Sequence, residues 1–147
     1  MEIKLATSDK EKEDLDQLLW EVLWKRLGFD HNIRETFKLE TRQIELIAVQ
    51  DRVVIGGLVA NWLPDSELEI RHIAVAADSQ ENSVGRHLFR ELISMIKSNN
   101  SIKIKSWARN TSIGFFAHLG FVATGELLEH PQFTKHEITF EQVVLNQ

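Results

Sequence analysis

Four residues with useful chemistry lie close together in the middle of the chain: Gln80, Ser83, Gly85 and Arg86. They follow an apolar-rich run of strand length that ends at Val75, and apolar residues then recur at helical spacing over residues 84–96. Amide N–H groups at a helix start lack intrahelical acceptors and carry partial positive charge, so this polar loop is a candidate phosphate site. An ordinary strand-to-helix turn capped by Ser83 is the plainer interpretation.

The rest of the chain predicts the elements that hold this loop. The pattern predicts strands at residues 3–5, 44–50, 53–62, 67–75, 102–108, 121–128 and 136–145. It predicts helices from Ser8 or Asp9 to Gly28, at 32–37, at 84–96, and shortly before Gly120, with a break in the chain at 98–101. With 147 residues, we expect one domain over residues 1–147.

The second strand pair contains two informative dipeptides. Asp51-Arg52 separates two apolar runs, which is typical of a two-residue hairpin turn. Gly56 and Gly57, inside the following run, indicate a bulge or a close approach of another segment to the backbone.

A second motif follows the strand at 102–108, in the segment ARNTSIGFFAHLGF. Its residues Asn110, Phe115, Phe116, Gly120 and Phe121, together with the loop after Val75, resemble two signatures of the GNAT superfamily of acyl-CoA-dependent N-acyltransferases. The resemblance covers nearly the whole chain. It implies an α/β (α+β) GNAT fold with a mixed central sheet of about seven strands and about four helices, in the order β-α-α-β-β-β-α-β-α-β-β.

The resemblance also implies a cofactor site for acetyl-CoA, used as co-substrate. By this resemblance the cofactor-binding residues are Ile73, Ala74, Val75, Gln80, Ser83, Val84, Gly85, Arg86, Asn110, Phe115 and Phe116. Relatives separate the strand ending at Val75 from the next strand, and the freed backbone groups bind the pantetheine arm. Ser83 stands where the family has Gly, so either Ser83 adopts helical dihedrals or the pyrophosphate site is weaker than in relatives.

The resemblance assigns the general base to Glu69, because relatives often carry a Glu six residues before the equivalent of Val75. A buried carboxylate can act as a general base near neutral pH. An exposed carboxylate paired with Arg71 is an equally good interpretation. His72 has a suitable titration range, but it would face the other side of a regular strand.

The proton donor for the leaving thiolate departs from the family pattern. Relatives commonly have a Tyr where this chain has Phe116, and the chain contains no tyrosine at all. The donor would then be water, His118 or Ser112, or the step would proceed without one, which is consistent with either a slow or an inactive enzyme.

Composition narrows the classes of partner. Seventeen basic and 22 acidic residues give a net charge of -5, which argues against nucleic-acid binding. The absence of cysteine excludes disulfides and thiolate chemistry, and the histidine spacing predicts no metal site. The acidic N-terminus and the lack of a long apolar run predict a soluble, cytoplasmic protein that does not bind membranes.

The leading hypothesis is therefore an acetyltransferase that moves the acetyl group of acetyl-CoA directly to a primary amine of a small molecule or peptide. The alternative is a GNAT-fold module that binds acyl-CoA or a protein partner with little or no catalysis. A third hypothesis is an interaction domain that dimerises through Trp20 and Trp24; these residues would otherwise pack within the fold or line an acceptor pocket.

Acceptor specificity is expected in residues 28–41, by resemblance to the segment that covers the acceptor site in the family. The candidates there are Asp30, His31, Arg34 and Glu35, each of which is also consistent with a solvated surface helix. His136 is expected in the last strand, where many relatives have a polar residue.

Overall fold

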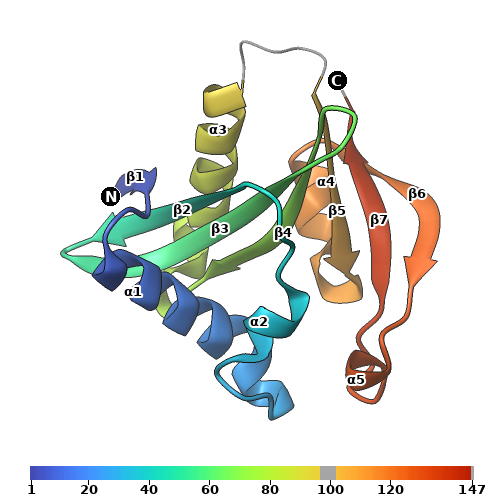
Figure 1. Cartoon of the computed structure of the whole chain (residues 1–147), viewed down its shortest axis with the longest axis horizontal. Coiled ribbons are helices and arrows are strands. Elements are labelled where there is room, and N and C mark those ends of the chain that lie inside the picture. Colours follow the sequence, from blue (N-terminus) through green and yellow to red (C-terminus); the bar gives the residue numbers. More distant parts are fainter. Residues whose placement is uncertain (97–101, 147) are drawn as a thin grey trace.

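The computed structural model describes residues 1–96 and 102–146, so the predicted break at 98–101 lies outside the described residues. Seven strands form one sheet in the order β1-β2-β3-β4-β5-β7-β6 (Figure 1). The strands are β1 (Glu2–Leu5), β2 (Gln43–Gln50), β3 (Val53–Leu63), β4 (Glu67–Val75), β5 (Lys103–Arg109), β6 (Phe121–Leu128) and β7 (Phe140–Leu145). β4 and β5 pair in parallel and the other pairs are antiparallel, so the sheet is mixed, as predicted.

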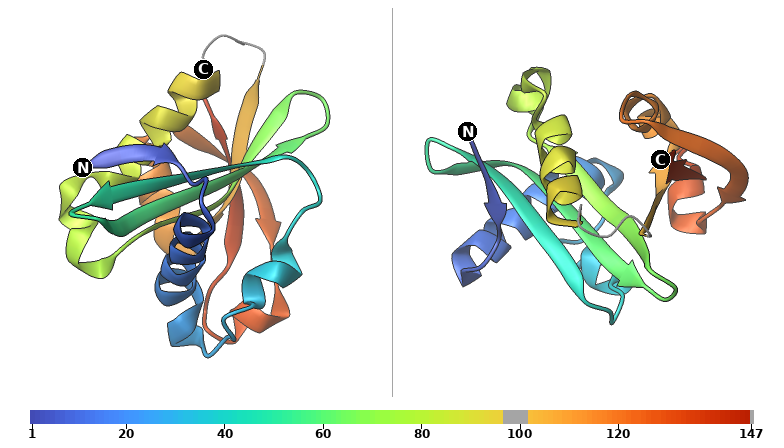
Figure 2. Two further views of the ribbon diagram at one scale, coloured as in Figure 1. Left: turned by 60° about the vertical axis from the view of Figure 1, so that its left-hand side comes forward. Right: turned by 90° about the horizontal axis from the view of Figure 1, so that it is seen from above.

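Helices cover both faces of the sheet. They are α1 (Asp9–Leu19), α2 (Ile33–Phe37), α3 (Val84–Ile96), α4 (Ile113–His118) and α5 (Pro131–Thr134). Helices α1 and α3 lie on opposite faces of the sheet (Figure 2), and Leu15 of α1 and Leu88 of α3 belong to two separate core clusters. Neighbouring residues of β3 divide between these cores, Leu58 facing α3 and Val59 facing α1, because side chains alternate along a strand. No helix in the described part of the chain is both long and apolar enough to cross a lipid bilayer.

The paired glycines of β3 allow both helices to approach the sheet closely. A Cβ atom on Gly56 would lie 2.7 Å from the side chain of Val84, at the start of α3. A Cβ atom on Gly57 would collide with Leu15 of α1. The pairing of β2 with β3 also shifts register beside Gly56, so that Ile55 has no partner residue on β2. Both features that the sequence predicted here, a bulge and a close approach, are present.

β4 contains a second bulge, which the sequence did not predict. Ile70 pairs with Ala60 and His72 pairs with Val59, so Arg71 is an extra residue on β4. A one-residue bulge reverses the alternation of the residues that follow it.

The core confirms this reversal. Leu68 and Ile70 face α3 before the bulge, whereas Ile73 and Val75 pack on the same core after it. Ala74 belongs to the core on the α1 face.

β4 and β5 separate along their length, as the resemblance implied. Their parallel pairing runs from Glu67 opposite Lys103 to Ile70 opposite Ser106 and then stops. Both strands continue, β4 to Val75 and β5 to Arg109, and they diverge toward the lower part of Figure 1. Backbone groups of β4 beyond the bulge are thereby released from pairing with β5.

The C-terminal region differs from the prediction. The chain between β6 and β7 contains the additional helix α5, so the part of the chain that the structure describes has five α-helices where about four were predicted. Pro131 at the first turn suits a helix start, because the N–H that proline lacks would have no intrahelical acceptor. The placement of His136 in the last strand was wrong: it lies in a turn after α5, and β7 begins only at Phe140.

Candidate active site

A cavity of about 510 Å³ opens where β4 and β5 separate. We call it the loop cavity. It lies between the end of β4, the start of α3 and the segment that contains α4, and it is also lined by His118, Thr111 and Ser112. Eight of the predicted cofactor-binding residues line it: Ile73, Ala74, Val75, Gln80, Ser83, Gly85, Arg86 and Phe115.

Ser83 adopts the left-handed conformation at the junction between the loop and α3. Its dihedral angles are φ 57 and ψ 27, a region that glycine enters freely and other residues enter at a cost. Its carbonyl accepts a hydrogen bond from the His87 amide at 3.1 Å, which begins the helical pattern. Of the two alternatives for Ser83, helical dihedrals are therefore wrong; the serine takes the backbone conformation that a glycine would take.

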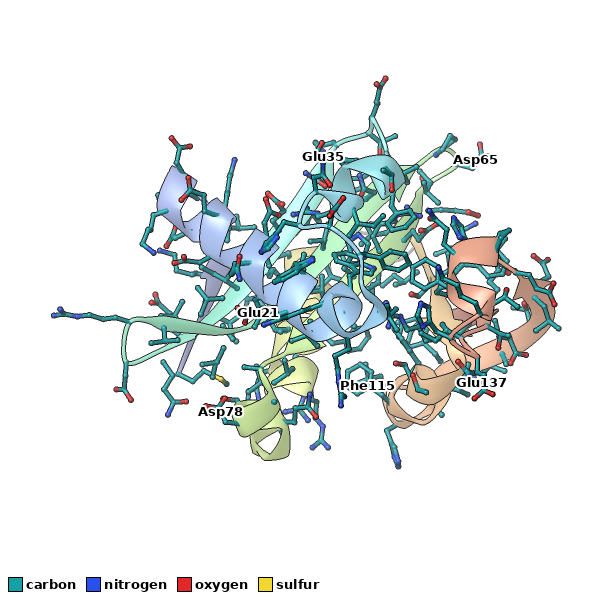
Figure 3. All side chains as sticks on the ribbon, turned by 90° about the horizontal axis from the view of Figure 1, so that it is seen from below. Glu21, Glu35, Asp65, Asp78, Phe115 and Glu137 are labelled. Carbon is teal, nitrogen blue, oxygen red and sulfur yellow. The ribbon has the colours of Figure 1, made fainter. Side chains whose placement is uncertain are left out.

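The first turn of α3 follows directly, so its amide N–H groups lie at the wall of the loop cavity without intrahelical acceptors. Gly85 in this turn faces Phe115 of α4: a Cβ atom there would be 3.0 Å from the ring. Figure 3 shows Phe115 between the start of α3 and α4. On the loop, the side-chain Nε2 of Gln80 donates a hydrogen bond to the Val75 carbonyl at 3.1 Å and holds the loop against the end of β4.

Three predicted cofactor residues lie elsewhere. The side chain of Val84 is fully buried in the core on the α3 face. Asn110 connects the start of α4 to the chain before β7: its Nδ2 donates to the Glu137 carbonyl at 3.2 Å, and its Oδ1 accepts from the Thr139 amide at 3.3 Å. Phe116 is 3% exposed and lines a different cavity.

That second cavity, of about 180 Å³, lies beside the loop cavity, and we call it the aromatic cavity. Its lining includes six aromatic side chains: Trp24, Phe37, Trp107, Phe116, Phe133 and Phe140. The two cavities share four lining residues, Leu23, Ile73, Arg109 and Ser112, and therefore adjoin. The arrangement can place two substrates side by side, one in each cavity.

Glu69 lines the aromatic cavity from β4 and is 6% exposed. Its Oε2 accepts a hydrogen bond from Nη1 of Arg71 at 2.6 Å, and Nη2 of Arg71 donates to the Phe37 carbonyl at 2.6 Å. The structure thus combines parts of the two interpretations, because Glu69 is paired with Arg71 but is buried at a cavity wall. Arg71 holds this carboxylate against the segment that contains α2.

His72 also lines the aromatic cavity. The prediction that it faces away from Glu69 was wrong, because the bulge at Arg71 brings both side chains to the same face of β4. Its imidazole packs edge-on against Trp24, with ring centroids 5.1 Å apart.

The environment of His72 keeps the imidazole uncharged. Burial, and then the positive charges of nearby arginines, lower the pKa of His72 to about 3. These arginines are Arg34, Arg71 and Arg109. His72 is therefore neutral at physiological pH.

Trp20 and Trp24 have different roles, and both pack within the fold. They lie on a π-helical turn, Trp20–Trp24, that continues α1. Trp24 is 3% exposed and lines the aromatic cavity. Trp20 stacks on His31, with ring centroids 3.5 Å apart, and its Nε1 donates to the Phe29 carbonyl at 2.8 Å. Trp24 is thus too buried to contribute to a dimer surface.

The segment that was expected to set acceptor specificity contributes one cavity residue, Phe37. Arg34 instead forms ion pairs with Asp16 and with Glu45, the latter at 2.7 Å, and is 8% exposed. Asp30 and Glu35 are not among the residues that line the two described cavities.

Arg109 is the main residue that the sequence reasoning missed. It ends β5 and lines both cavities. Burial lowers the pKa of its guanidinium below the usual value. Its position, at the end of the strand adjacent to β4 and immediately before Asn110, was the available signal, because side chains at the ends of neighbouring parallel strands lie at the same edge of a sheet. Phe133 and Phe140 carried no signal, since they enter the cavity from α5, a helix that was not predicted, and from β7.

Comparison with known proteins identifies the family. Residues 9–121 match the acetyltransferase (GNAT) family, and the chain belongs to it. Acetyl-CoA is the co-substrate of this family.

Solved structures of similar fold are numerous, and their sequences are distant. An aminoglycoside 6'-N-acetyltransferase complexed with coenzyme A is 15% identical, with a TM-score of 0.77 over 98% of this chain and 96% of that one. Escherichia coli ElaA is 13% identical, with a TM-score of 0.79 over 99% of both chains. An acyl-CoA N-acyltransferase from Pseudomonas aeruginosa is 16% identical, with a TM-score of 0.75 over 99% of this chain and 98% of that one. These likenesses establish the GNAT fold.

Within residues 1–96 and 102–146, no group of three or more His, Cys, Asp or Glu side chains is arranged to hold a metal ion.

Proposed function

We propose that this protein transfers the acetyl group of acetyl-CoA to a primary amine of a small molecule or peptide. The observation that carries the proposal is the separation of β4 from β5 beyond Ile70 and Ser106, which leaves two adjoining cavities with shared walls. The loop cavity suits the co-substrate, because the first turn of α3 and the Arg86 side chain can bind phosphate groups. The aromatic cavity suits the amine.

In the proposed reaction, the amine nitrogen forms a bond to the thioester carbonyl carbon, the C–S bond breaks, and the amine loses a proton. Glu69 is the proposed general base, since it is a buried carboxylate at the wall of the aromatic cavity. Ser112 and His118 are the candidates for giving a proton to the thiolate, because both line the loop cavity and Phe116 has no hydroxyl group.

The test is calorimetric titration of the purified protein with acetyl-CoA and, separately, with coenzyme A. We expect micromolar affinity for acetyl-CoA, about -8 kcal/mol. Thiol release over a panel of primary amines then measures transfer, and the protein adds no thiol background because it has no cysteine. No heat of binding up to millimolar acetyl-CoA would refute the proposal.

A second candidate function is acyl-CoA binding without efficient transfer. The observation that favours it is the buried Phe116 ring in the place where relatives commonly have a tyrosine. Tight binding of acetyl-CoA without thiol release for any amine of the panel would support this second function and contradict the first.

A further inference from the structure

We infer that the aromatic cavity binds an acceptor that carries a carboxylate beside its amine and an aromatic or bulky apolar side chain, as an aromatic α-amino acid does, with Arg109 as the carboxylate-binding residue. This inference rests on the proposed acetyl transfer and names the substrate class of the same site. Its basis is the charge of the cavity, the bonding of Arg109 and the character of the remaining wall.

Arg109 is a partly buried cation whose bonding is incomplete. Its Nη2 donates to the Leu23 carbonyl at 2.8 Å, and its Cζ lies 5.5 Å from the centroid of the Phe133 ring. Among the residues that the structure describes, no acidic side chain forms an ion pair with it. A guanidinium removed from water without a counter-ion is costly, and arginine cannot lose its charge by deprotonation.

The position of Arg109 suits a ligand anion. Its side chain lines both cavities, so it lies at the boundary where an acceptor would meet the co-substrate. A guanidinium presents a planar set of donors that matches a carboxylate with two parallel hydrogen bonds. A carboxylate bound here would supply the missing counter-ion.

The charge of the aromatic cavity points the same way. Its described lining contains one acidic side chain, Glu69, which is already paired with Arg71, against two guanidinium groups. His72 adds no charge, because burial and then the surrounding arginines keep its imidazole neutral. A polycationic acceptor would meet net positive charge in this cavity, whereas a zwitterion would leave its amine for Glu69 and its carboxylate for Arg109.

The aromatic residues that line the cavity favour an aromatic side chain on the acceptor. Trp24, Phe37, Phe133 and Phe140 contribute four rings from four separate elements, and Phe133 itself packs edge-on against Phe140 with centroids 5.3 Å apart. Rings in such edge-to-face arrangements favour a further aromatic group by the same geometry. A cavity of about 180 Å³ limits the size of that group.

The experiment compares N-acetyl-L-phenylalanine, the product expected from L-phenylalanine, with N-acetyl-L-phenylalaninamide, in which a neutral carboxamide replaces the carboxylate. Both lack a titrating amine, so the difference between their affinities reports on the carboxylate. Calorimetric titration of the wild-type protein, with and without saturating coenzyme A, should show that the acid binds about tenfold to a hundredfold more tightly than the amide. Equal affinities, or binding of neither compound at millimolar concentration, would overturn the inference.

Arg109→Gln should remove the preference for the acid, and Arg109→Lys should retain part of it. The matched control is Arg42→Gln, because Arg42 packs over Trp62 and lines neither cavity; it should keep the wild-type preference. Thermal unfolding verifies that the variants fold, and the wild-type comparison stands without them. A preference for the acid that survives Arg109→Gln in a folded variant would refute the role of Arg109.

The two proposals fail in different ways. If the wild-type protein does not bind acetyl-CoA, the proposed function is refuted. If it binds acetyl-CoA but does not distinguish the acid from the amide, only the proposed acceptor class is refuted. A thiol-release assay with L-phenylalanine and kanamycin adds a direct comparison of a zwitterion with a polycation. Faster transfer to kanamycin would also overturn the inference.

Discussion

The two adjoining cavities are constructed in different ways. Much of the loop cavity comes from one continuous stretch, from Ile73 on β4 to Arg86 on α3, and the co-substrate binding proposed for it relies mainly on backbone groups. The aromatic cavity combines the ends of β4 and β5 with side chains from distant parts of the chain, including Trp24, Phe37 and Phe140. A backbone site tolerates change in most side chains, whereas an assembled side-chain site changes with every substitution. If the co-substrate binds in the loop cavity as proposed, substitutions in the aromatic cavity can change the acceptor while co-substrate binding is kept.

The strongest test of this comparison is the removal of the Glu69 carboxylate from the wall of the aromatic cavity. Glu69→Gln should lower the rate of acetyl transfer by about a hundredfold to ten-thousandfold, as expected for loss of a general base. Affinity for acetyl-CoA should stay unchanged, since Glu69 does not line the loop cavity. Steady-state thiol release and calorimetry measure the two effects.

The matched control is Glu67→Gln on the same strand. Glu67 forms an ion pair with Lys105 at 3.0 Å and lines neither cavity, so its loss should leave the transfer rate near the wild-type value. An equal loss of rate in both variants would mean that Glu69 acts through the stability of β4 and not as a base.

The opposite experiment disturbs the loop cavity alone. Gly85→Val should weaken acetyl-CoA binding by at least about tenfold, because the added atoms meet Phe115 and displace the ring or the first turn of α3. Gly114→Ala is the control, since a Cβ atom there meets nothing within 4 Å. Unchanged affinity in the valine variant would show that the first turn of α3 does not form the phosphate site.

A smaller effect concerns the neutral His72 in the aromatic cavity. Burial and nearby arginines lower its pKa to about 3 in the folded protein, from 6.5. Between these values the unfolded chain binds a proton that the folded chain does not, so the free energy of unfolding falls as pH decreases. The contribution of His72 is at most about 1.4 kcal/mol per pH unit and should amount to about 1 kcal/mol between pH 7 and 5.5.

Urea unfolding at several pH values measures this dependence. His72→Phe should reduce the pH dependence of the unfolding free energy over this range. His118→Gln, at an exposed histidine, should leave that pH dependence unchanged. The same slope in wild type and His72→Phe would exclude His72 as its source.

The smallest expected effect is at Ser83. Ser83→Gly should change acetyl-CoA affinity by less than about threefold, because the serine already adopts the left-handed conformation that glycine would adopt. Ser83→Val, with a branched side chain that avoids this region, should weaken binding and serves as the contrasting variant. A large gain in affinity with glycine would show that the natural loop is impaired.

The loop cavity could be predicted from sequence better than the aromatic cavity, because it is built from one continuous stretch of the chain. The order of strands, the separation of β4 from β5 and the loop around Gln80 to Arg86 follow from short-range patterns and from the family resemblance. His72 was misplaced because β4 was treated as a regular strand. The available signal for the bulge at Arg71 was the change in spacing of the apolar residues, from Leu68 and Ile70 to Ile73 and Val75. Arg109 and Phe133 were missed because their significance depends on which distant segments meet, and a single sequence does not encode those contacts as a local pattern.

The bulge on β4 has a consequence for how the strand tolerates change in length. Because Arg71 is the extra residue, odd-numbered positions before it and even-numbered positions after it lie on the face of the sheet that α1 covers. Deleting this residue would restore a regular strand and exchange the two sides of everything from position 72 to 75. His72 and Ala74 would turn into the core beneath α3, and Ile73 and Val75 would turn out of it. The proposed site therefore depends on the number of residues in β4 as much as on the side chains that line it.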